Sequence, residues 1–177
     1  MKKISLILFF IILCSVSVSA QQLRVRVFSQ QKIKQTSFVP SFGRYSVEID
    51  GNLTRLSRTS NVKLSALNGK VEIRINDSVF ANSEKVTFKS EGIKSFFRLK
   101  PIAPEIAERR YDDALEVSVN GNGNLVLINI VEQENYIAGV VQSETWGATK
   151  NIDFFKVQAI CCRNYLFRNK NKHSKDG

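Results

Sequence analysis

Glu144 has the clearest chemical potential in this sequence, because it ends an apolar stripe at helical spacing. The stripe has members at i, i+3, i+4 and i+7, on one helical face: Ile137, Val140, Val141 and Glu144. Apolar walls, to which Trp146 adds, and the negative end of the helix dipole both disfavour an ionised carboxylate. A glutamic acid kept partly protonated near neutral pH suits protonation of a glycosidic oxygen. The alternative is a glutamate that only caps its helix or pairs with a nearby lysine.

Three polar residues on the following helical stretch are candidates to assist Glu144. Gln158 lies among apolar residues, so its amide needs hydrogen-bond partners if that helix is buried. It would either bond a loop or orient Glu144 and a sugar. Lys156 and Arg163 are seven residues apart and lie on roughly one face. These cations would either pair with structural carboxylates or line a groove for a sugar acid.

The elements that must position these residues are two helices near the end of the chain. After Val131 the hydrophobic period changes from that of a strand to that of a helix, which predicts a first helix ending near Glu144. Residues 145–149 are predicted to form a loop. A second helix should start near Asn151, a good N-cap residue, and run to Phe167. Because that run is apolar almost all round, we expect this helix to be largely buried.

The preceding part of the chain has the alternation of β-strands. Period-two segments occur at residues 23–28, 70–75 and 85–89. The turn signals that separate the predicted strands are Asp50-Gly51, Asn68-Gly69 and Glu91-Gly92. A clear hairpin follows, with strands at 115–119 and 125–131 joined by the Asn- and Gly-rich stretch 120–124. The predicted fold class is therefore α+β, with a strand-rich N-terminal half, a β-hairpin and two helices.

The first twenty residues have the layout of a secretory signal peptide. Lys2 and Lys3 form a positive region, residues 4–14 an apolar one, and Val18-Ser19-Ala20 offers small residues for cleavage. We expect cleavage near Ala20, a secreted, periplasmic or envelope location, and membrane contact only during export. The alternative is an uncleaved anchor. Pro101 and Pro104 mark a further boundary, giving a predicted signal peptide at 1–20, a β-rich region at 21–104 and a C-terminal domain at 105–177.

The charge balance favours an anionic partner. The chain has 26 Lys and Arg against 16 Asp and Glu, a formal charge of +10, which becomes 10 − 2 = +8 without Lys2 and Lys3. Such a field suits nucleic acid, acidic lipid or acidic wall polysaccharide, and export argues against nucleic acid. The alternative is that the charge mainly provides solubility. Cys161 and Cys162 are adjacent and point in different directions on a helix, so we expect neither a shared disulfide nor a shared metal.

Residues 111–165 resemble the SpoIID/LytB domain, the family of the stage II sporulation protein D. Residues 134–144 read Glu-Asn-Tyr-Ile-Ala-Gly-Val-Val-Gln-Ser-Glu, and residues 155–165 read Phe-Lys-Val-Gln-Ala-Ile-Cys-Cys-Arg-Asn-Tyr. These segments are similar to the family's Gly-Val-Val-x-Ser-Glu and Lys-x-Gln-Ala-x-x-x-Arg-x-Tyr blocks, at the family's spacing. The resemblance implies a peptidoglycan lytic transglycosylase that cleaves between N-acetylmuramic acid and N-acetylglucosamine.

The resemblance also assigns roles to residues. Glu144 would be the single catalytic acid/base, which protonates the glycosidic oxygen and then accepts the proton of the muramic C6 hydroxyl as a 1,6-anhydro ring closes. The expected substrate-binding residues are Ser143, Trp146, Lys156, Gln158 and Arg163. The expected partners are peptidoglycan glycan strands and other cell-wall hydrolases.

Three departures from the family pattern modify these expectations. Thr145-Trp146 stands where the family has Met-Pro, and Cys161-Cys162 stands where it has two alanines. The sequence ends at Gly177, before the family's Asp-x-x-Cys and Cys-Gln-x-Tyr segments, which with a histidine hold zinc in some members. His173 alone completes no such site, so we expect no metal or other cofactor and a C-terminally truncated domain.

Two other functions remain open. The chain would be a non-catalytic cell-wall-binding protein or amidase enhancer, a role that the LytB part of the family name also carries. Alternatively it would be an envelope β-domain whose helical tail is structural.

Overall fold

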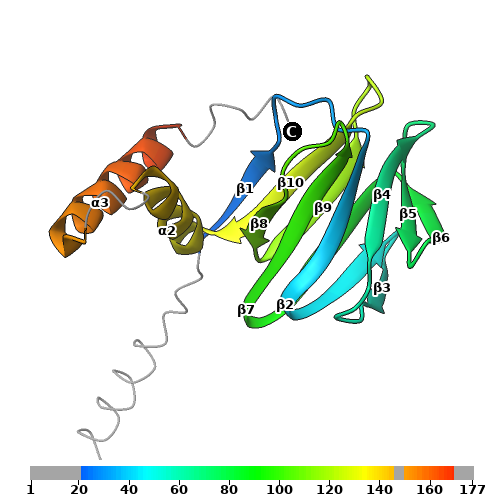
Figure 1. The fold of residues 1–177 in the computed structure, drawn as a ribbon, viewed down its shortest axis with the longest axis horizontal. Coiled ribbons are helices and arrows are strands. Elements are labelled where there is room, and N and C mark those ends of the chain that lie inside the picture. The colour runs from blue at the N-terminus through cyan, green and yellow to red at the C-terminus, as the bar shows by residue number, and fades with distance from the viewer. Residues whose placement is uncertain (1–20, 146–149, 170–177) are drawn as a thin grey trace, which may run out of the picture.

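A computed structural model describes residues 21–145 and 150–169 of the chain (Figure 1). The predicted signal peptide, Trp146 and His173 lie outside these residues. Neither helix in the described ranges has the length and hydrophobicity needed to cross a lipid bilayer.

One antiparallel sheet takes up most of the described chain, and two helices follow it, so the predicted α+β class is confirmed (Figure 1). In space the main order is β1-β10-β9-β7-β2-β4-β5-β6, with β3 on β2 and β8 on β7. The strands are β1 (Gln22–Val27), β2 (Gln35–Ile49), β3 (Asn52–Arg55), β4 (Val62–Leu67), β5 (Lys70–Ile75), β6 (Ser78–Ser83), β7 (Lys85–Ala103), β8 (Arg109–Asp112), β9 (Ala114–Val119) and β10 (Leu125–Glu132). The helices are α2 (Gln133–Glu144) and α3 (Ile152–Asn169).

The long strands β2 and β7 pair with each other and bend together, which folds the sheet into two layers (Figure 1). The first four residues of β2 pair with β4 and its last four with β3. Register shifts between Pro40 and Arg44 mark the bend in β2. Gly43 is required there, because its φ is +82° and a Cβ would lie 2.2 Å from Ser95 Oγ. The predicted turn at Glu91-Gly92 is wrong, since Gly92, with φ of +104°, only bends β7.

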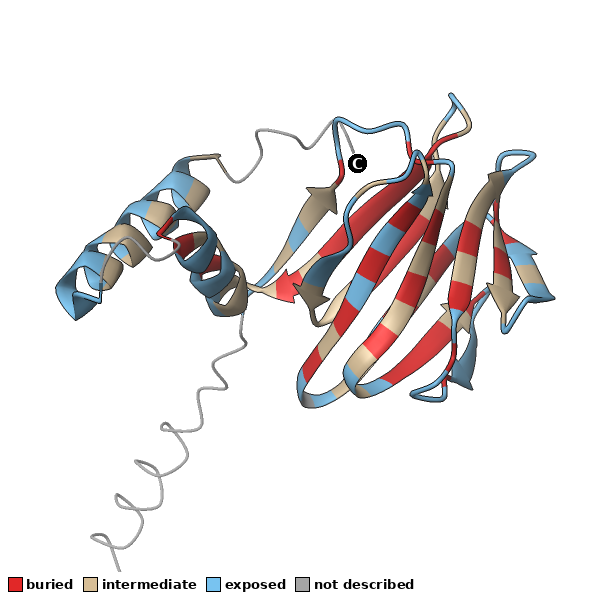
Figure 2. Ribbon diagram, in the orientation of Figure 1, coloured by how far each residue is buried: buried red, intermediate tan, exposed pale blue. Residues whose placement is uncertain are grey.

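The core lies between the two layers and is built around aromatic rings. Phe38 is fully buried and stacks on Phe88 with ring centroids 4.1 Å apart, and it also contacts Phe97 at 4.9 Å. Tyr45 is buried edge-on to Phe38 and donates its hydroxyl hydrogen to the carbonyl of Asp113 at 2.8 Å. Along the strands buried residues alternate with more exposed ones, as expected of a sheet with one face in the core (Figure 2).

Several tight turns form where the sequence predicts them. Asn68 and Gly69 both have positive φ and reverse the chain between β4 and β5, and Asp50 and Gly51 do the same between β2 and β3. In the β9–β10 hairpin the carboxamide oxygen of Asn120 accepts hydrogen bonds from two backbone amides of the turn, at 3.0 and 3.1 Å. The predicted hairpin is therefore confirmed.

The sheet is continuous across the predicted domain boundary at residue 104. β9 and β10 follow that residue in sequence, yet β9 pairs with β7 and β10 pairs with β1. Strands from the predicted β-rich region and from the predicted C-terminal domain therefore belong to the same sheet. Division of the sequence at residue 104 remains a prediction.

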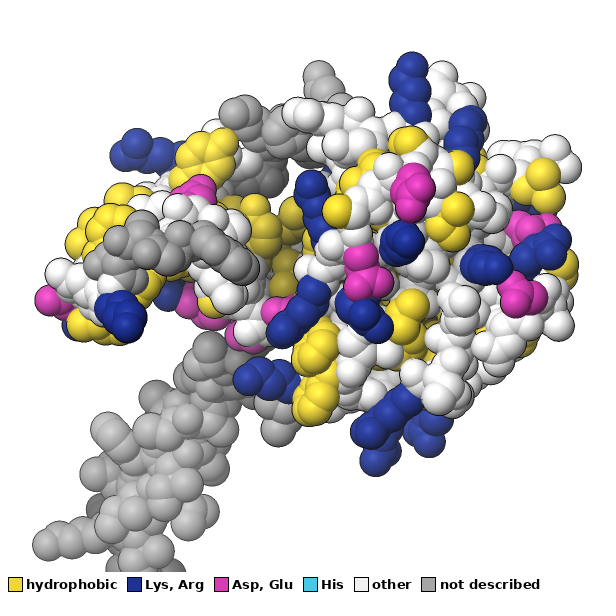
Figure 3. Space-filling model, viewed as in Figure 1, with side chains coloured by type: hydrophobic (Ala, Val, Ile, Leu, Met, Phe, Trp, Pro, Cys, Tyr) yellow, Lys and Arg dark blue, Asp and Glu magenta, His cyan; other side chains and the backbone are white. Residues whose placement is uncertain are grey.

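The second helix differs from expectation in its burial. Asn151 caps α3 by accepting a hydrogen bond from the Asp153 amide at 2.9 Å, as predicted. However, α3 has no fully buried residue, so the prediction of a largely buried helix is wrong. The reason is that α3 packs mainly on α2, to one side of the sheet, and keeps apolar side chains at the surface (Figures 1 and 3). Its exposed apolar residues include Ile152, Val157, Ile160 and Phe167.

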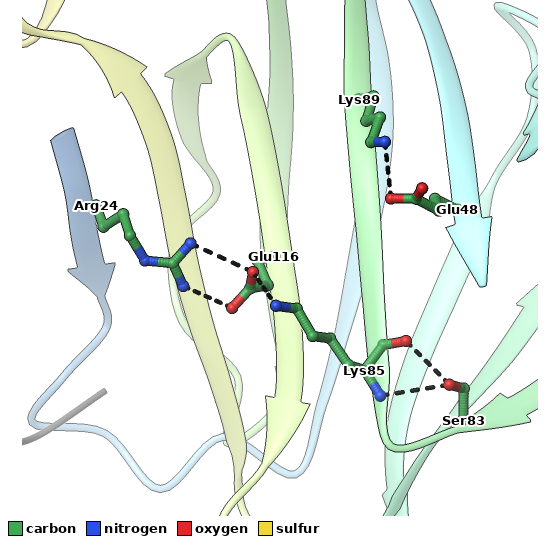
Figure 4. Close-up of polar contacts among 6 residues, drawn as sticks. All are labelled: Arg24, Glu48, Ser83, Lys85, Lys89 and Glu116. Atoms are coloured by element: carbon green, nitrogen blue, oxygen red, sulfur yellow. Dashed lines mark hydrogen bonds and ion pairs between the residues drawn. The ribbon is translucent and has the colours of Figure 1, made fainter. Parts of the chain in front are cut away.

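An ion cluster joins three strands on the outer side of the sheet (Figure 4). Glu116 on β9 accepts from Arg24 on β1 at 2.6 Å and from Lys85 on β7 at 2.7 Å. Arg24 reaches Glu116 across β10. Ile128 on β10 is the cross-strand partner of Glu116, so it lies on the same face of the sheet, and its side chain is buried there. Burial opposes ionisation of Glu116, but the hydrogen bonds and charges of Arg24 and Lys85 outweigh it and hold the pKa of Glu116 below its usual range.

Replacing Glu116 by Gln removes the charge but keeps the side-chain shape. We expect Glu116→Gln to lower the free energy of unfolding at pH 7 by about 1.5–3 kcal/mol, the range for hydrogen bonds to charged groups. Because the folded-state pKa is lowered, the stabilisation is present above the unfolded pKa of about 4.3 and is lost as pH falls through the folded value. Urea unfolding of both proteins at pH 7 and pH 3 measures this, and a difference that does not shrink at pH 3 contradicts it.

Candidate functional site

The first helix of the site begins directly after β10 and is tied to the sheet by a buried polar contact. Asn129 on β10 is buried and donates both amide hydrogens, to Asp112 O at 2.7 Å and Ala114 O at 2.9 Å. These bonds hold Asp113, whose φ is +64°, so that its carboxylate accepts from the Glu132 amide at 2.9 Å. This carboxylate therefore fixes the point at which β10 becomes α2. Its negative charge also interacts favourably with the positive, N-terminal end of the helix dipole.

An ion pair between the helices sets their relative position. Arg163 on α3 donates to Glu134 on α2 through Nε at 3.2 Å and through Nη2. The bidentate geometry fixes direction as well as distance. The hydrogen bond from Arg163 holds the pKa of Glu134 below its usual range. Both side chains are about half exposed, so the pair orients the helices more than it stabilises them.

Glu144 and Gln158 meet at the opposite end of this helix pair. The side-chain amide of Gln158 donates to Glu144 Oε2, which joins the last residue of α2 to the second turn of α3. Gln158 is half-buried, so the contact satisfies an amide that would otherwise lose solvation. The predicted proximity of these two side chains is observed, and Gln158 contacts Glu144 rather than a loop.

The burial expected for Glu144 is not found. Ile137 and Val141 are buried, and Val140 is half-buried, but Glu144 itself is exposed. The apolar stripe therefore ends one turn before the carboxylate, because α3, the helix that faces it, is itself mostly at the surface. The expectation that apolar walls enclose this carboxyl group is wrong for the described residues.

Two half-buried polar side chains, Tyr136 on α2 and Cys162 on α3, nevertheless lie within reach of the charge of Glu144. Burial raises the pKa of Tyr136, and the charges of Cys162, Tyr165 and Glu144 add to that rise. Burial also raises the pKa of Cys162, with a further contribution from Glu144. The field of Glu144 thus acts on both groups, which sequence reasoning did not connect with it.

The other predicted binding residues are engaged in local contacts. Arg163 pairs with Glu134, and Lys156 pairs with Asp153 on its own helix at 3.0 Å, so both cations meet structural carboxylates. Ser143 is exposed and donates to the Val140 carbonyl at 2.9 Å. Trp146 lies outside the described residues.

A shallow groove of about 550 Å³ runs between α2 and α3. It is lined mainly by apolar side chains, among them Ile137, Val141, Phe155 and Ile160. Lys156 and Arg163 also line it, whereas Glu144 does not. Glu144 therefore lies outside the groove that the two cations line.

No metal site is formed by the described residues. Within residues 21–145 and 150–169, no group of three or more His, Cys, Asp or Glu side chains is arranged to hold an ion. Cys161 and Cys162 are both free thiols.

Residues 121–177 match the family model described as Stage II sporulation protein, SpoIID. The match starts in the β9–β10 turn and takes in β10, α2 and α3, the elements that carry Glu134, Glu144, Gln158 and Arg163. This segment is SpoIID-like. The SpoIID family is related to sporulation and the cell wall. No curated protein and no solved structure matches the chain.

Sequence reasoning missed the residues that hold the SpoIID-like segment in place. Glu134 appears in the quoted motif, but its partner Arg163 is 29 positions away, and a single sequence shows no pairing at that separation. Asp113 lies before the hairpin and gives no signal except that the short polar side chain tolerates positive φ. Both residues act by positioning helices rather than by touching Glu144.

The ion pair between the helices yields a double-mutant prediction. We expect Glu134→Gln and Arg163→Met each to speed hydrogen exchange of α3 amides. Comparison of the double mutant with the two single mutants should give a coupling free energy of about 0.2–1 kcal/mol between the two side chains. Hydrogen–deuterium exchange measures this in all four proteins. Lys156→Gln, which removes only a pair within α3, is the control and should show no coupling with Glu134→Gln. Zero coupling between Glu134 and Arg163 would contradict a positioning role.

Proposed function

We propose that this protein cleaves the glycan strands of peptidoglycan as a lytic transglycosylase, with Glu144 as the acid/base. The contact between Glu144 and Gln158 carries the proposal. It joins the glutamate of one SpoIID-like motif block to the glutamine of the other, so the two segments that define the resemblance meet at one carboxylate.

The geometry of this contact suits proton transfer. Gln158 donates to Oε2 of Glu144 and so orients the carboxyl group, which leaves Oε1 to face a substrate. In the first step the protonated Glu144 gives its proton to the glycosidic oxygen as the bond to the muramic anomeric carbon breaks. In the second step Glu144 takes the proton of the muramic C6 hydroxyl, whose oxygen attacks the anomeric carbon and closes the 1,6-anhydro ring.

A single carboxylate is sufficient for this chemistry. Ordinary glycosidases need a second carboxylate, either to activate water or to form a covalent intermediate. An internal hydroxyl takes the place of water here, so one group serves first as acid and then as base. A glycan strand lying over the exposed Glu144 would exclude water and favour the protonated form that the first step requires.

The remaining properties of the chain agree with a substrate outside the cytoplasm. The proposed signal peptide would direct the chain to the periplasm or cell envelope, where peptidoglycan lies. The formal charge of +8 after its removal would attract the free lactyl carboxylates of muramic acid in strands without stem peptides. Other wall hydrolases, which produce such strands by removing the peptides, are the proposed functional partners.

Glu144→Gln tests the catalytic role. We expect release of 1,6-anhydro products from peptide-free glycan strands to fall at least about 100-fold, since general acid–base groups contribute that much or more. The measurement is mass spectrometry of the products with time. Glu84→Gln, which removes an exposed carboxylate on the loop before β7, is the control and should retain release. Undiminished release by Glu144→Gln would rule out the acid/base role.

A second candidate is a non-catalytic wall-binding protein or amidase enhancer. The exposure of Glu144 and its absence from the lining of the groove between α2 and α3 favour it. On this alternative the wild-type protein releases no 1,6-anhydro products. It then sediments with purified sacculi equally well with and without Glu144→Gln, and binding weakens as salt rises.

A further inference from the structure

A stacked aromatic pair lies where β2 and β7 bend, with Phe42 exposed and Phe96 half-buried. Phe42 and Phe96 are cross-strand partners whose rings are 5.4 Å apart between centroids and inclined by only 10°. The guanidinium of Arg110 on β8 lies 3.8 Å from the centroid of Phe96. Because β7 lies between β2 and β8, Phe42 and Arg110 contact Phe96 from opposite sides.

One side of the Phe42 ring is left open by the topology. β2 pairs with β4 only up to Phe38 and with β3 only from Ser46, so between them β2 has no strand partner on its far side. Phe42 accordingly keeps 54% of its surface exposed. Its inner side packs on Phe96, which Arg110 covers in turn, so the ring is a flat and accessible platform.

The backbone around Phe42 determines the direction in which its side chain points. The register shifts on either side of Phe42 re-aim its side chain relative to a regular strand. Gly43 makes the bulge possible, since its positive φ and the contact with Ser95 exclude any side chain. An exposed aromatic ring held by so constrained a backbone is more than a ring left at the surface by chance.

The same face carries a polar surface that continues from the platform along β2. A hollow of about 420 Å³ lies next along the strand, lined by Ser37, Val39, Asn61, Lys63, Lys100 and Glu105 among others. Ser37 and Phe42 are five residues apart, so hollow and ring together extend about 17 Å along the strand at about 3.3 Å per residue. Figure 3 views this face, with hydrophobic side chains at the bends of β2 and β7 and charged side chains of both signs beyond them.

Several cations of this face are paired with carboxylates. Four have an acidic partner within ion-pair distance: Arg98 with Glu108 at 3.0 Å, Arg110 with Asp112 at 3.4 Å, Lys63 with Asp77 at 2.5 Å and Lys100 with Glu105 at 3.9 Å. These four pairs carry no net charge, although the chain as a whole is strongly basic. They offer paired donors and acceptors, which suit hydroxyl groups.

We propose that this face, defined by Phe42, Phe96, Arg110 and the adjoining hollow, binds an extended, hydroxyl-rich glycan strand. The apolar face of a sugar ring stacks on Phe42, since its C–H groups meet the negative face of the aromatic ring. Neighbouring sugars place their hydroxyls on the guanidinium, ammonium and carboxylate groups of the hollow. The site is separate from Glu144, and it relies on the glycan-directed part of the proposed function but not on catalysis.

The experiment measures binding of peptide-free glycan strands by isothermal titration calorimetry in the Glu144→Gln background, which prevents any cleavage. We expect Phe42→Ala to weaken binding about tenfold, the order found for loss of a stacking ring. Phe42→Trp should retain it. Phe80→Ala is the matched control, because it removes another exposed phenylalanine, 45% exposed, from β6. Thermal unfolding of each variant checks that it is folded.

Salt dependence separates this site from charge attraction by the whole chain. Raising salt from about 50 to about 200 mM should change the Phe42-dependent part of binding by less than about threefold, whereas a polyanion site making many ionic contacts loses about a thousandfold or more. Equal binding by Phe42→Ala and the parent, or equal weakening by Phe80→Ala, overturns the proposal. So does an effect of Phe42→Ala on self-association alone. If instead the parent binds through Phe42 but the wild-type protein releases no 1,6-anhydro products, the catalytic proposal fails and this one stands.

Discussion

The pairing of β2 with β7 is the constraint on which the rest of the structure depends. Each strand contributes one half to each layer, so their shared bend closes the sheet over its own core. Phe38 and Phe88 meet only because of that bend, since they stand on different layers. The bend in turn places β9 and β10 at the edge from which α2 departs. Packing in the core, the exposed face and the position of the helices therefore follow from one strand pair.

The strand-rich region shows what local pattern can and cannot predict. The alternation at 70–75 matches β5 residue for residue, and Asn68-Gly69 forms its expected turn because both residues accept positive φ. By contrast, β2 was not predicted as one strand, because Pro40 and Gly43 interrupt its pattern as a loop would. Gly92 was predicted to lie in a turn for the same reason, although it lies within β7. A glycine that bends a strand and one that ends it look alike until its partner strand is known.

At the helices, spacing predicted contacts better than environment. The two motif blocks bring Gln158 to Glu144, as their positions on consecutive helices suggested. Two members of the predicted apolar stripe, Ile137 and Val141, are buried. It did not predict the exposure of α3, because an apolar sequence indicates which side chains favour burial but not whether any neighbour covers them. The tie of α2 to the sheet through Asp113 and Asn129 depends on tertiary contacts that no local pattern encodes.

The bulge at Gly43 has a consequence for how this surface changes over generations. The bulge serves both the closure of the core and the aim of Phe42, whereas the ring itself contributes little to folding because it stands half in water. If selection acted on folding alone, Gly43 would therefore be retained, whereas Phe42 would be free to be replaced. In descendants that no longer need this surface, position 42 should drift towards polar residues while position 43 stays invariant.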